Sequence, residues 1–416
     1  MLLSKQTTIR VTKEQSNIVN HLGYAAYKLW NVCNYERKTY DPETGADYPD
    51  WYKQKASHKD DMWYKALPSQ TAQEVCKVLD KSWKSYFRLV KTKGIVNPHP
   101  PRYKNDPISV TYMQNGIKRI DNITLRLTLT KAFKKHMSER YGIHEDYLII
   151  KNKIFDDMDN IKQIKIYMPE DNEMKIIVVY EIAEKELKED NGRYLSIDLG
   201  LHNLMTCYDS AGKSFIIGRQ YLSICRRYDK EIRRIEGQCA AQQVKKGIKY
   251  PKPSKHILEL YDKKRNSVKD ILHKYTREIV SYCENNHINT IIIGDLTGIR
   301  EDNDLGDRIN QQLHSLPYRK IYEMLEYKSR LAGIRFEMVK ESYSSQCSPM
   351  SEYVGKDTAK PQNRTKRGLY DHDGVIWNAD CVGAFNIMRL YMRQNGIQEI
   401  IDLNGLNTTE TIKVAV

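Results

Sequence analysis

The stretch YLSIDLG, Tyr194–Gly200, decides the fold of the second half of the chain. Apolar residues alternate here with Ser196 and Asp198, and this period of two predicts a β-strand that ends at the glycine. A carboxylate inside an apolar strand is unfavourable to bury without a partner. A metal ion shared with other carboxylates is the usual partner, so Asp198 predicts an acidic cluster. A solvated aspartate at a strand end is the alternative.

Composition favours a polyanionic partner. The 416 residues carry 67 Lys and Arg against 53 Asp and Glu, which gives a net charge of +14 and a pI near 9.1. The 29 tyrosines add rings that can stack on unpaired bases, although most of them are expected to be ordinary core or surface residues.

Several features predict a cytoplasmic protein. The eight cysteines have no paired spacing, which favours a reducing compartment over a disulfide framework. No apolar run approaches the roughly 20 residues of a membrane span, and the first residues, MLLSKQTTIR, do not resemble a signal peptide.

The first half of the chain is expected to combine strands with an inserted helical module. A short strand at 7–11 precedes apolar residues at helical spacing over about 14–36 and 72–90, which predict a helical module at 14–92. The proline-rich stretch at 97–104 ends it. The following apolar runs predict a β-barrel or sandwich that spans 1–13 and 93–190, with strands near 108–113, 117–120, 123–129, 161–168 and 175–182.

The second half predicts a mixed sheet with carboxylates at strand ends. Strands are expected at 206–208, 214–217 and 289–296, with long basic helices at 221–244 and 255–287. A further strand ends at Glu341, and the helix over 378–391 carries Asp380 in its first turn. Such acids suit two divalent cations that clamp the oxygens of a phosphodiester during hydrolysis. Oxygen ligands favour Mg²⁺, with Mn²⁺ as the substitute.

Four motifs together resemble the TnpB family of transposon-encoded, RNA-guided DNA endonucleases, which is related to compact type V CRISPR effectors. They are SIDLG at 196–200, ESYSSQCS at 341–348, KRGLY at 366–370 and NADCVGAFNI at 378–387. The resemblance implies an α+β multidomain chain: a β-barrel wedge domain (1–13 and 93–190) with an inserted helical recognition module (14–92). A RuvC/RNase H-like nuclease domain (191–341 and 378–416) would follow, with an insertion at 342–377 that loads the target nucleic acid.

The resemblance also implies the catalytic acids. Asp198 matches the first acid of the RuvC-like site and Asp380 the third. The second acid departs from the usual pattern, because Gly294 stands where the family has a glutamate and Asp295 points to the other face of its strand. We assign the second acid to Glu341, as in a branch of the family with a relocated glutamate. Asp295 is the alternative, and a site without a functional second acid is also open.

A second departure concerns zinc. Many members of the family hold a four-cysteine zinc ribbon, whereas this chain has Cys347-Ser348-Pro349-Met350 and no second C-x-x-C pair before Asp380. We therefore expect no zinc, with Cys347 and Cys381 as packed thiols and 342–377 as a metal-free insertion.

By resemblance, the protein would bind a guide RNA and cleave complementary double-stranded DNA beside a short flanking motif. It would act as a monomer rather than a homodimer. An RNA-guided DNA-binding repressor with an inactive nuclease is the competing function. Basic and aromatic candidates for nucleic-acid contacts are Lys53, Lys55, Tyr103, Lys104, Arg226, Arg227, Arg364, Lys366 and Arg367.

Overall fold

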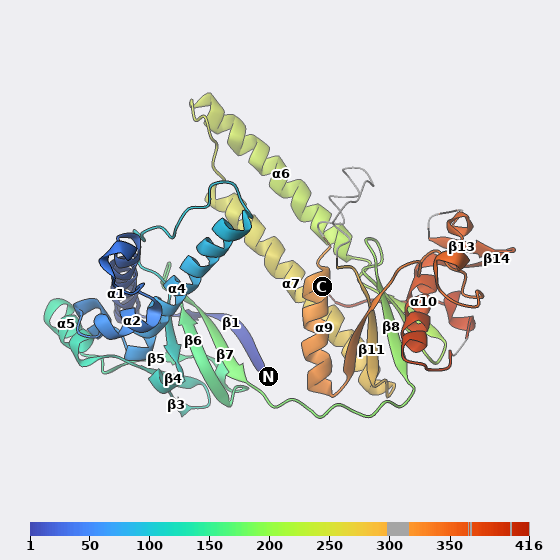
Figure 1. Cartoon of the computed structure of the whole chain (residues 1–416), viewed down its shortest axis with the longest axis horizontal. Coiled ribbons are helices and arrows are strands. Elements are labelled where there is room, and N and C mark those ends of the chain that lie inside the picture. The colour runs from blue at the N-terminus through green and yellow to red at the C-terminus, as the bar shows by residue number, and fades with distance from the viewer. Residues whose placement is uncertain (298–315, 365, 367, 400–401, 416) are drawn as a thin grey trace. The chain divides into compact units, whose positions relative to one another are not determined.

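The computed structural model describes residues 1–297, 316–364, 366, 368–399 and 402–415. The chain forms two compact units, Met1–Ala183 and Glu184–Val416 (Figure 1). No helix in the described parts of the chain combines the length and the apolar character needed to cross a membrane.

The first unit contains two antiparallel sheets. The larger has the order β1 (Leu2–Arg10), β7 (Glu173–Glu181), β6 (Asn160–Ile166) and β2 (Val110–Met113). The smaller joins β3 (Ile117–Asp121), β4 (Thr124–Thr128) and β5 (Tyr147–Lys151). Every second residue of β7 is buried, from Met174 to Tyr180, as expected for a strand with one face on the core.

The expected closed barrel is wrong. Among the residues that the structure describes, neither sheet of the first unit closes on itself. The reason is local: a 3-10 turn at Gln114–Gly116 interrupts the chain after the four-residue strand β2. The strands after this turn then pair with each other in a sheet of their own. Helix α5 (Lys131–Tyr141) and strand β5, which the sequence analysis did not predict, complete this second part.

The predicted helices of the first unit are present. Helix α1 (Lys13–Lys38) starts at a capping box between Thr12 and Gln15 and packs against α4 (Ser69–Thr92), with the short helices α2 (Trp51–Ser57) and α3 (Met62–Lys65) between them in sequence. Leu22 and Leu29 of α1 and Leu79 of α4 are fully buried in one core with the strands. The helices therefore share the core of the sheets.

The second unit is built on a mixed sheet in the order β12-β11-β8-β9-β10-β15. Strands β8 (Tyr194–Leu199), β9 (Met205–Asp209) and β10 (Lys213–Ile217) form an antiparallel meander. Strands β11 (Thr290–Asp295) and β12 (Arg335–Lys340) run parallel to β8, whereas the short β15 (Glu410–Ile412) pairs with β10. Because β8, β11 and β12 are parallel, their carboxyl ends meet at the same edge of the sheet.

Helices cover both faces of this sheet. Helices α7 (Lys255–Asn285) and α9 (Tyr318–Ala332) share one core with Ile197 and Ile293, and α10 (Ala379–Gln394) shares another with Ile292. Residues 198 and 294 lie on the α10 face, by the alternation of the strands. Helix α6 (Tyr221–Lys245) forms a long hairpin with α7 (Figure 1); of its 25 residues, all described, Tyr221 and Ile232 are buried.

A small hairpin leads into α10. Strand β13 (Leu369–His372) pairs with β14 (Val375–Asn378), and α10 begins at the next residue. The segment between β12 and β13 has little regular structure apart from short 3-10 turns at Lys356–Thr358 and Pro361–Asn363.

Candidate active site

Asp198 lies one residue before the end of β8 and faces α10. A Cβ atom on Gly383 of α10 would lie well inside van der Waals distance of Asp198 Oδ2, so the helix can approach this carboxylate only because residue 383 is a glycine. The glycine in the NADCVGAFNI motif therefore has a packing reason that involves the first predicted acid directly.

Glu341 follows β12 immediately and extends its side chain to β11. A Cβ atom on Gly294 would overlap with Glu341 Oε2, and Ile387 Cδ1 of α10 would lie 3.0 Å from it. The Glu341 carboxylate therefore fills the space beside the bare Gly294 backbone, on the face of the sheet that α10 covers. Its Oε2 atom is buried and accepts no hydrogen bond from any residue that the structure describes.

Asp380 stands in the first turn of α10, whose N-cap is Asn378. Asn378 Oδ1 accepts hydrogen bonds from the backbone N–H groups of Asp380 at 3.0 Å and Cys381 at 3.3 Å. The Asp380 carboxylate accepts a hydrogen bond from Asn203 Nδ2 at 2.7 Å, and Arg364 Nη2 lies 3.9 Å from its Oδ1 atom.

Asp198 is the acid on which the other two act electrostatically. Burial, and repulsion from Glu341 and then from Asp380, raise the pKa of Asp198 well above its usual range. Burial, with repulsion from Asp295, also raises the pKa of Glu341. A bound cation would remove both penalties, since it stabilises the ionised carboxylates.

Asp295, the alternative second acid, is directed elsewhere. It ends β11 in the same alternation as Ile291 and Ile293, away from Gly294. Its Oδ1 atom accepts a hydrogen bond from Thr297 N at 2.8 Å and one from Thr297 Oγ1 at 2.5 Å, so the side chain stabilises the turn after the strand.

The donor set suits a hard cation. The three predicted acids carry carboxylate oxygens, and Glu341 Oε2 is buried without a partner within the described residues. In the described part of the chain, no group of three or more His, Cys, Asp or Glu side chains is placed so that it could hold a metal ion together. Mg²⁺ keeps several waters and is often held by only one or two carboxylates, so these residues fit such an ion.

The basic and aromatic candidates are divided between the two units. In the first unit, Lys55 Nζ lies 4.8 Å from the Trp51 ring centroid and 5.0 Å from that of Tyr52. Lys38 stacks in the same manner on Tyr103 at 4.4 Å, and Lys104 on Trp30 at 5.0 Å. Lys53, on α2 with Lys55, pairs with Asp47.

In the second unit, Arg226 and Arg227 lie on α6. Arg364 and Lys366 are in the segment between β12 and β13. Of these candidates, Arg364 is the one that approaches the acids, through Asp380. Arg367 lies outside the described residues.

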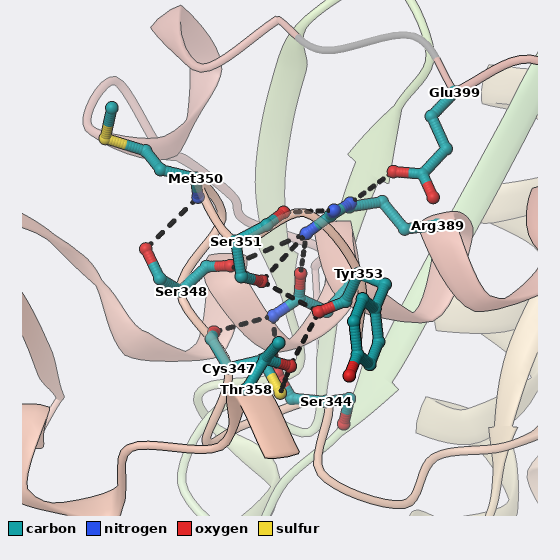
Figure 2. Close-up of polar contacts among 10 residues, drawn as sticks. Ser344, Cys347, Ser348, Met350, Ser351, Tyr353, Thr358, Arg389 and Glu399 are labelled. Carbon is teal, nitrogen blue, oxygen red and sulfur yellow. Dashed lines mark hydrogen bonds and ion pairs between the residues drawn. The ribbon is translucent and has the colours of Figure 1, made fainter. Parts of the chain in front are cut away.

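The segment after Glu341 is anchored to α10 by two polar residues that the sequence analysis missed (Figure 2). Asn386 Nδ2 donates to the carbonyls of Ser344 at 2.7 Å and Cys347 at 2.9 Å. Arg389 donates to Glu399 Oε2 at 2.6 Å and to the Ser351 carbonyl at 2.5 Å. Both side chains are buried, with exposures of 0% and 2%. The sequence did contain a signal for them, because Asn386 and Arg389 are polar residues three positions apart in a largely apolar stretch of α10.

The two thiols that flank this segment are packed. Cys347 is fully buried and its Sγ donates to the Gly355 carbonyl at 3.3 Å. Cys381 is equally buried and lies 3.6 Å from Ser214 Oγ. His372 lies on β13 beside Asn363, 3.3 Å from Nδ1 to Nδ2.

Two family models match this chain. Residues 177–300 match the OrfB_IS605 family, described as a probable transposase, and residues 318–387 match the Cas12f1-like TNB domain. The resemblance to TnpB is confirmed. The TnpB-type segment contains Asp198 and Gly294, whereas the TNB-type segment contains Glu341 and Asp380. The predicted acids are therefore divided between the two matched segments. No curated protein matches the chain.

Solved structures give weaker likenesses. A Cas12f1–sgRNA–target DNA complex has 14% identity and a TM-score of 0.37, covering 94% of this chain and 100% of that one. CasPhi-2 (Cas12j) bound to crRNA and phosphorothioate DNA has 10% identity and a TM-score of 0.48, covering 96% and 92%. Alicyclobacillus acidoterrestris C2c1 with single-guide RNA has 11% identity and a TM-score of 0.44, covering 91% and 67%. Each TM-score is below 0.5, so the relationship of this chain to TnpB rests on the two family matches.

Proposed function

We propose that this TnpB-type chain is an RNA-guided DNA endonuclease that hydrolyses phosphodiester bonds at one RuvC-like site. The observation that carries the proposal is the Glu341 carboxylate, which fills the space beside Gly294 and acts electrostatically on Asp198. Repulsion from Asp380 also acts on Asp198, which supports grouping the three predicted acids in one site. The two family matches support the same class of protein.

The sheet of the second unit supports a RuvC/RNase H-like nuclease domain at 191–341 and 378–416. An antiparallel three-stranded meander is followed by two parallel strands on the side of its first strand, and α10 packs on one face. In this arrangement Asp198 lies on β8, Glu341 directly follows β12, and Asp380 lies in the first turn of α10.

Asp198, Glu341 and Asp380 would hold Mg²⁺, as two ions, with Mn²⁺ able to replace it. The ions would activate the attacking water and stabilise the charge that develops on the phosphate. The chain would position these carboxylates: Gly294 leaves room for that of Glu341, Gly383 leaves room for that of Asp198, and Asn378 caps the helix that carries Asp380. The cluster is ready to bind a cation because its own charges repel.

The remaining parts would bind nucleic acid. We assign 1–13 and 93–190 to a wedge domain, 14–92 to a recognition module and 342–377 to loading of the target. Together they would hold a guide RNA and its heteroduplex with target DNA mainly through the phosphate backbone, and the protein would read a short flanking motif. The candidates for these contacts remain those predicted from the sequence: Lys53, Lys55, Tyr103, Lys104, Arg226, Arg227, Arg364, Lys366 and Arg367. The protein would act as a monomer.

Plasmid cleavage with co-purified RNA and Mg²⁺ tests the proposal. Asp198→Ala and Glu341→Ala should abolish cleavage, whereas Asp295→Ala should retain it. Loss with Asp295→Ala and retention with Glu341→Ala would move the second acid to Asp295. Absence of cleavage by the wild-type protein, with guide-dependent DNA binding intact, would favour an RNA-guided repressor instead.

A further inference from the structure

The side chain of Asn203 connects Asp380 to an arginine outside the acidic cluster. Asn203 Nδ2 donates to Asp380 Oδ2 at 2.7 Å, and Arg219 Nε donates to Asn203 Oδ1 at 3.0 Å. Asn203 lies in the turn between β8 and β9, while Arg219 lies just before α6. The three residues come from separate parts of the chain and form one continuous path of hydrogen bonds.

The turn holds Asn203 in place. Gly200 N donates to the Leu204 carbonyl at 3.3 Å, and a Cβ atom on residue 200 would lie 2.8 Å from the Asn203 carbonyl oxygen. Only glycine leaves room for this close approach. The turn that starts directly after the strand of Asp198 therefore fixes the residue that contacts Asp380.

The identity of the neighbours determines which way the Asn203 amide faces. A guanidinium group can only donate hydrogen bonds, so the amide oxygen must face Arg219. The amide NH₂ then faces Asp380, where an ionised carboxylate can only accept. Arg219 thus sets the orientation in which Asn203 supports the Asp380 carboxylate, and the contact occupies Oδ2 while Oδ1 faces Arg364.

We propose that Asn203 and Arg219 are positioning residues for Asp380, which fix its carboxylate for metal binding, and that Asn203 does not contact the scissile phosphate. This inference rests on the proposed function of the acidic site. Residues that hydrogen-bond to metal ligands typically change metal affinity or activity by roughly 10–100-fold when they are replaced. Asn203→Ala should therefore weaken divalent metal binding by about 10-fold or more.

We call the hydrogen-bonded path from Arg219 through Asn203 to Asp380 the relay. It also predicts how the substitutions of Asn203 and Arg219 combine. Arg219 acts on Asp380 only through Asn203, so Arg219→Ala should have a smaller effect than Asn203→Ala. The double variant should be no worse than Asn203→Ala alone, since the second change removes nothing that remains in use. Two residues that bound phosphate separately would instead have additive effects. Arg219→Lys retains a donor and should recover part of the loss.

The experiment measures Mn²⁺ binding to the full-length chain by electron paramagnetic resonance, without nucleic acid. The Mg²⁺ dependence of plasmid cleavage provides a second measurement. The proteins compared are wild type, Asn203→Ala, Arg219→Ala, Arg219→Lys, the double alanine variant and Asp198→Ala. Arg330→Ala is the matched control, because this arginine is exposed on α9 and pairs only with Glu326 among the described residues. Thermal unfolding checks that each variant is folded. Arg219→Ala, which leaves the turn intact, keeps the test valid if Asn203→Ala does not fold.

The outcomes separate the inference from the proposed function. Weaker Mn²⁺ binding in Asn203→Ala, with a double variant that is no worse, supports the relay. Wild-type affinity in Asn203→Ala, or an additive double variant, overturns the relay and leaves the nuclease site standing. A wild-type protein that binds Mn²⁺ no better than Asp198→Ala overturns the proposed site and the relay together.

Discussion

Glu341 Oε2 occupies the position that a side chain on Gly294 would need. Gly294 pairs with Val339 of the neighbouring parallel strand β12, and Glu341 lies two residues after Val339, directly after the end of that strand. The Glu341 side chain extends from the end of β12 to β11, where its carboxylate takes the space that a side chain at position 294 would fill. The position of the Glu341 carboxylate therefore depends on the absence of a side chain at Gly294.

Gly294→Ala should inactivate the proposed nuclease without unfolding it. The added methyl group would displace the Glu341 carboxylate from the cluster, and a misplacement of about 1 Å at a reacting group can lower activity by roughly 100-fold. Plasmid cleavage under single-turnover conditions measures the loss.

Gly237→Ala provides the matched control for this substitution. Gly237 lies within α6, and no atom would lie within 4 Å of its new Cβ, so this variant should cleave at the wild-type rate and be slightly more stable. Full activity in Gly294→Ala would show that Glu341 does not act from the position described.

The sequence indicated candidate acids for the site, but it did not indicate how the residues around them pack. The resemblance to TnpB indicated Asp198 and Asp380, and Glu341 was assigned because it ends the strand expected beside that of Gly294. The packing of Gly383 against Asp198 could not be predicted, because it depends on how closely α10 approaches the sheet. The contact between Asn203 and Asp380 joins residues 177 positions apart, and nothing in the spacing of either one indicates the other.

The prediction of a β-barrel in the first unit was wrong for a related reason. Most of the expected strands of the first unit are present, but whether a sheet closes depends on which edges pair, and edge pairing is not encoded in the alternation of any single strand. The short strand β2 pairs with β6, and β3 pairs with β4. Strand periodicity predicted the elements, whereas the turn at Gln114–Gly116 decided their arrangement.

Arg389→Met should loosen the segment after Glu341. Methionine has a similar length but leaves the Ser348 and Ser351 carbonyls without their guanidinium donor, so we expect a loss of about 3 kcal/mol in the free energy of unfolding. Hydrogen exchange of the amides at 344–358 and chemical denaturation measure the effect.

Arg393→Met is the matched control on the same helix. Arg393 is exposed and stacks on Tyr353 at 4.7 Å, so its replacement should change stability by less than about 1 kcal/mol. Unchanged exchange rates in Arg389→Met would mean that Asn386 alone holds the segment.

Asp80→Ala should destabilise the first unit. Arg37 Nη1 lies 3.0 Å from Asp80 Oδ1, with side-chain exposures of 0% and 5%, so the substitution leaves a buried guanidinium without its carboxylate. Breaking such a pair from one side costs about 3–5 kcal/mol. Tryptophan fluorescence during chemical denaturation reports on this unit, because four of the five tryptophans lie in it.

Lys84→Ala distinguishes the contribution of the buried pair between Arg37 and Asp80 from that of the exposed pair between Lys84 and Asp80. Lys84 Nζ lies 2.8 Å from Asp80 Oδ2, but its side chain is 72% exposed, so this variant should lose much less stability than Asp80→Ala. Equal losses in the two variants would contradict the central role of the contact between Arg37 and Asp80.

Because the pKa of Lys328 is lowered in the folded chain, the second unit should become more stable as the pH rises above 8. Burial between α9 and α7, followed by repulsion from Arg277, lowers the pKa of this lysine from 10.5 to about 8. Its Nζ donates to the His273 carbonyl at 2.6 Å and to Thr276 Oγ1 at 2.7 Å. The folded chain therefore releases this proton at a lower pH than the unfolded chain does.

The direction of the pH effect follows from proton binding in the two states. Between about pH 8 and 10.5 the unfolded chain binds more protons at this residue, so the free energy of unfolding increases with pH across that window. Below pH 8 both states are protonated and the unfavourable burial of the charge persists in full. Because the lysine is partly open to water, we expect a change on the order of 1–2 kcal/mol.

The comparison that isolates Lys328 is between wild type and Lys328→Met, since tyrosines and cysteines also titrate in this range. The difference in unfolding free energy between the two proteins, measured by denaturation at pH 7, 8, 9 and 10, should shift in favour of the wild type as the pH rises. Lys320→Met on the exposed side of α9 should show no such trend. A pH-independent difference for Lys328→Met would mean that the lysine keeps its ordinary pKa in the folded protein.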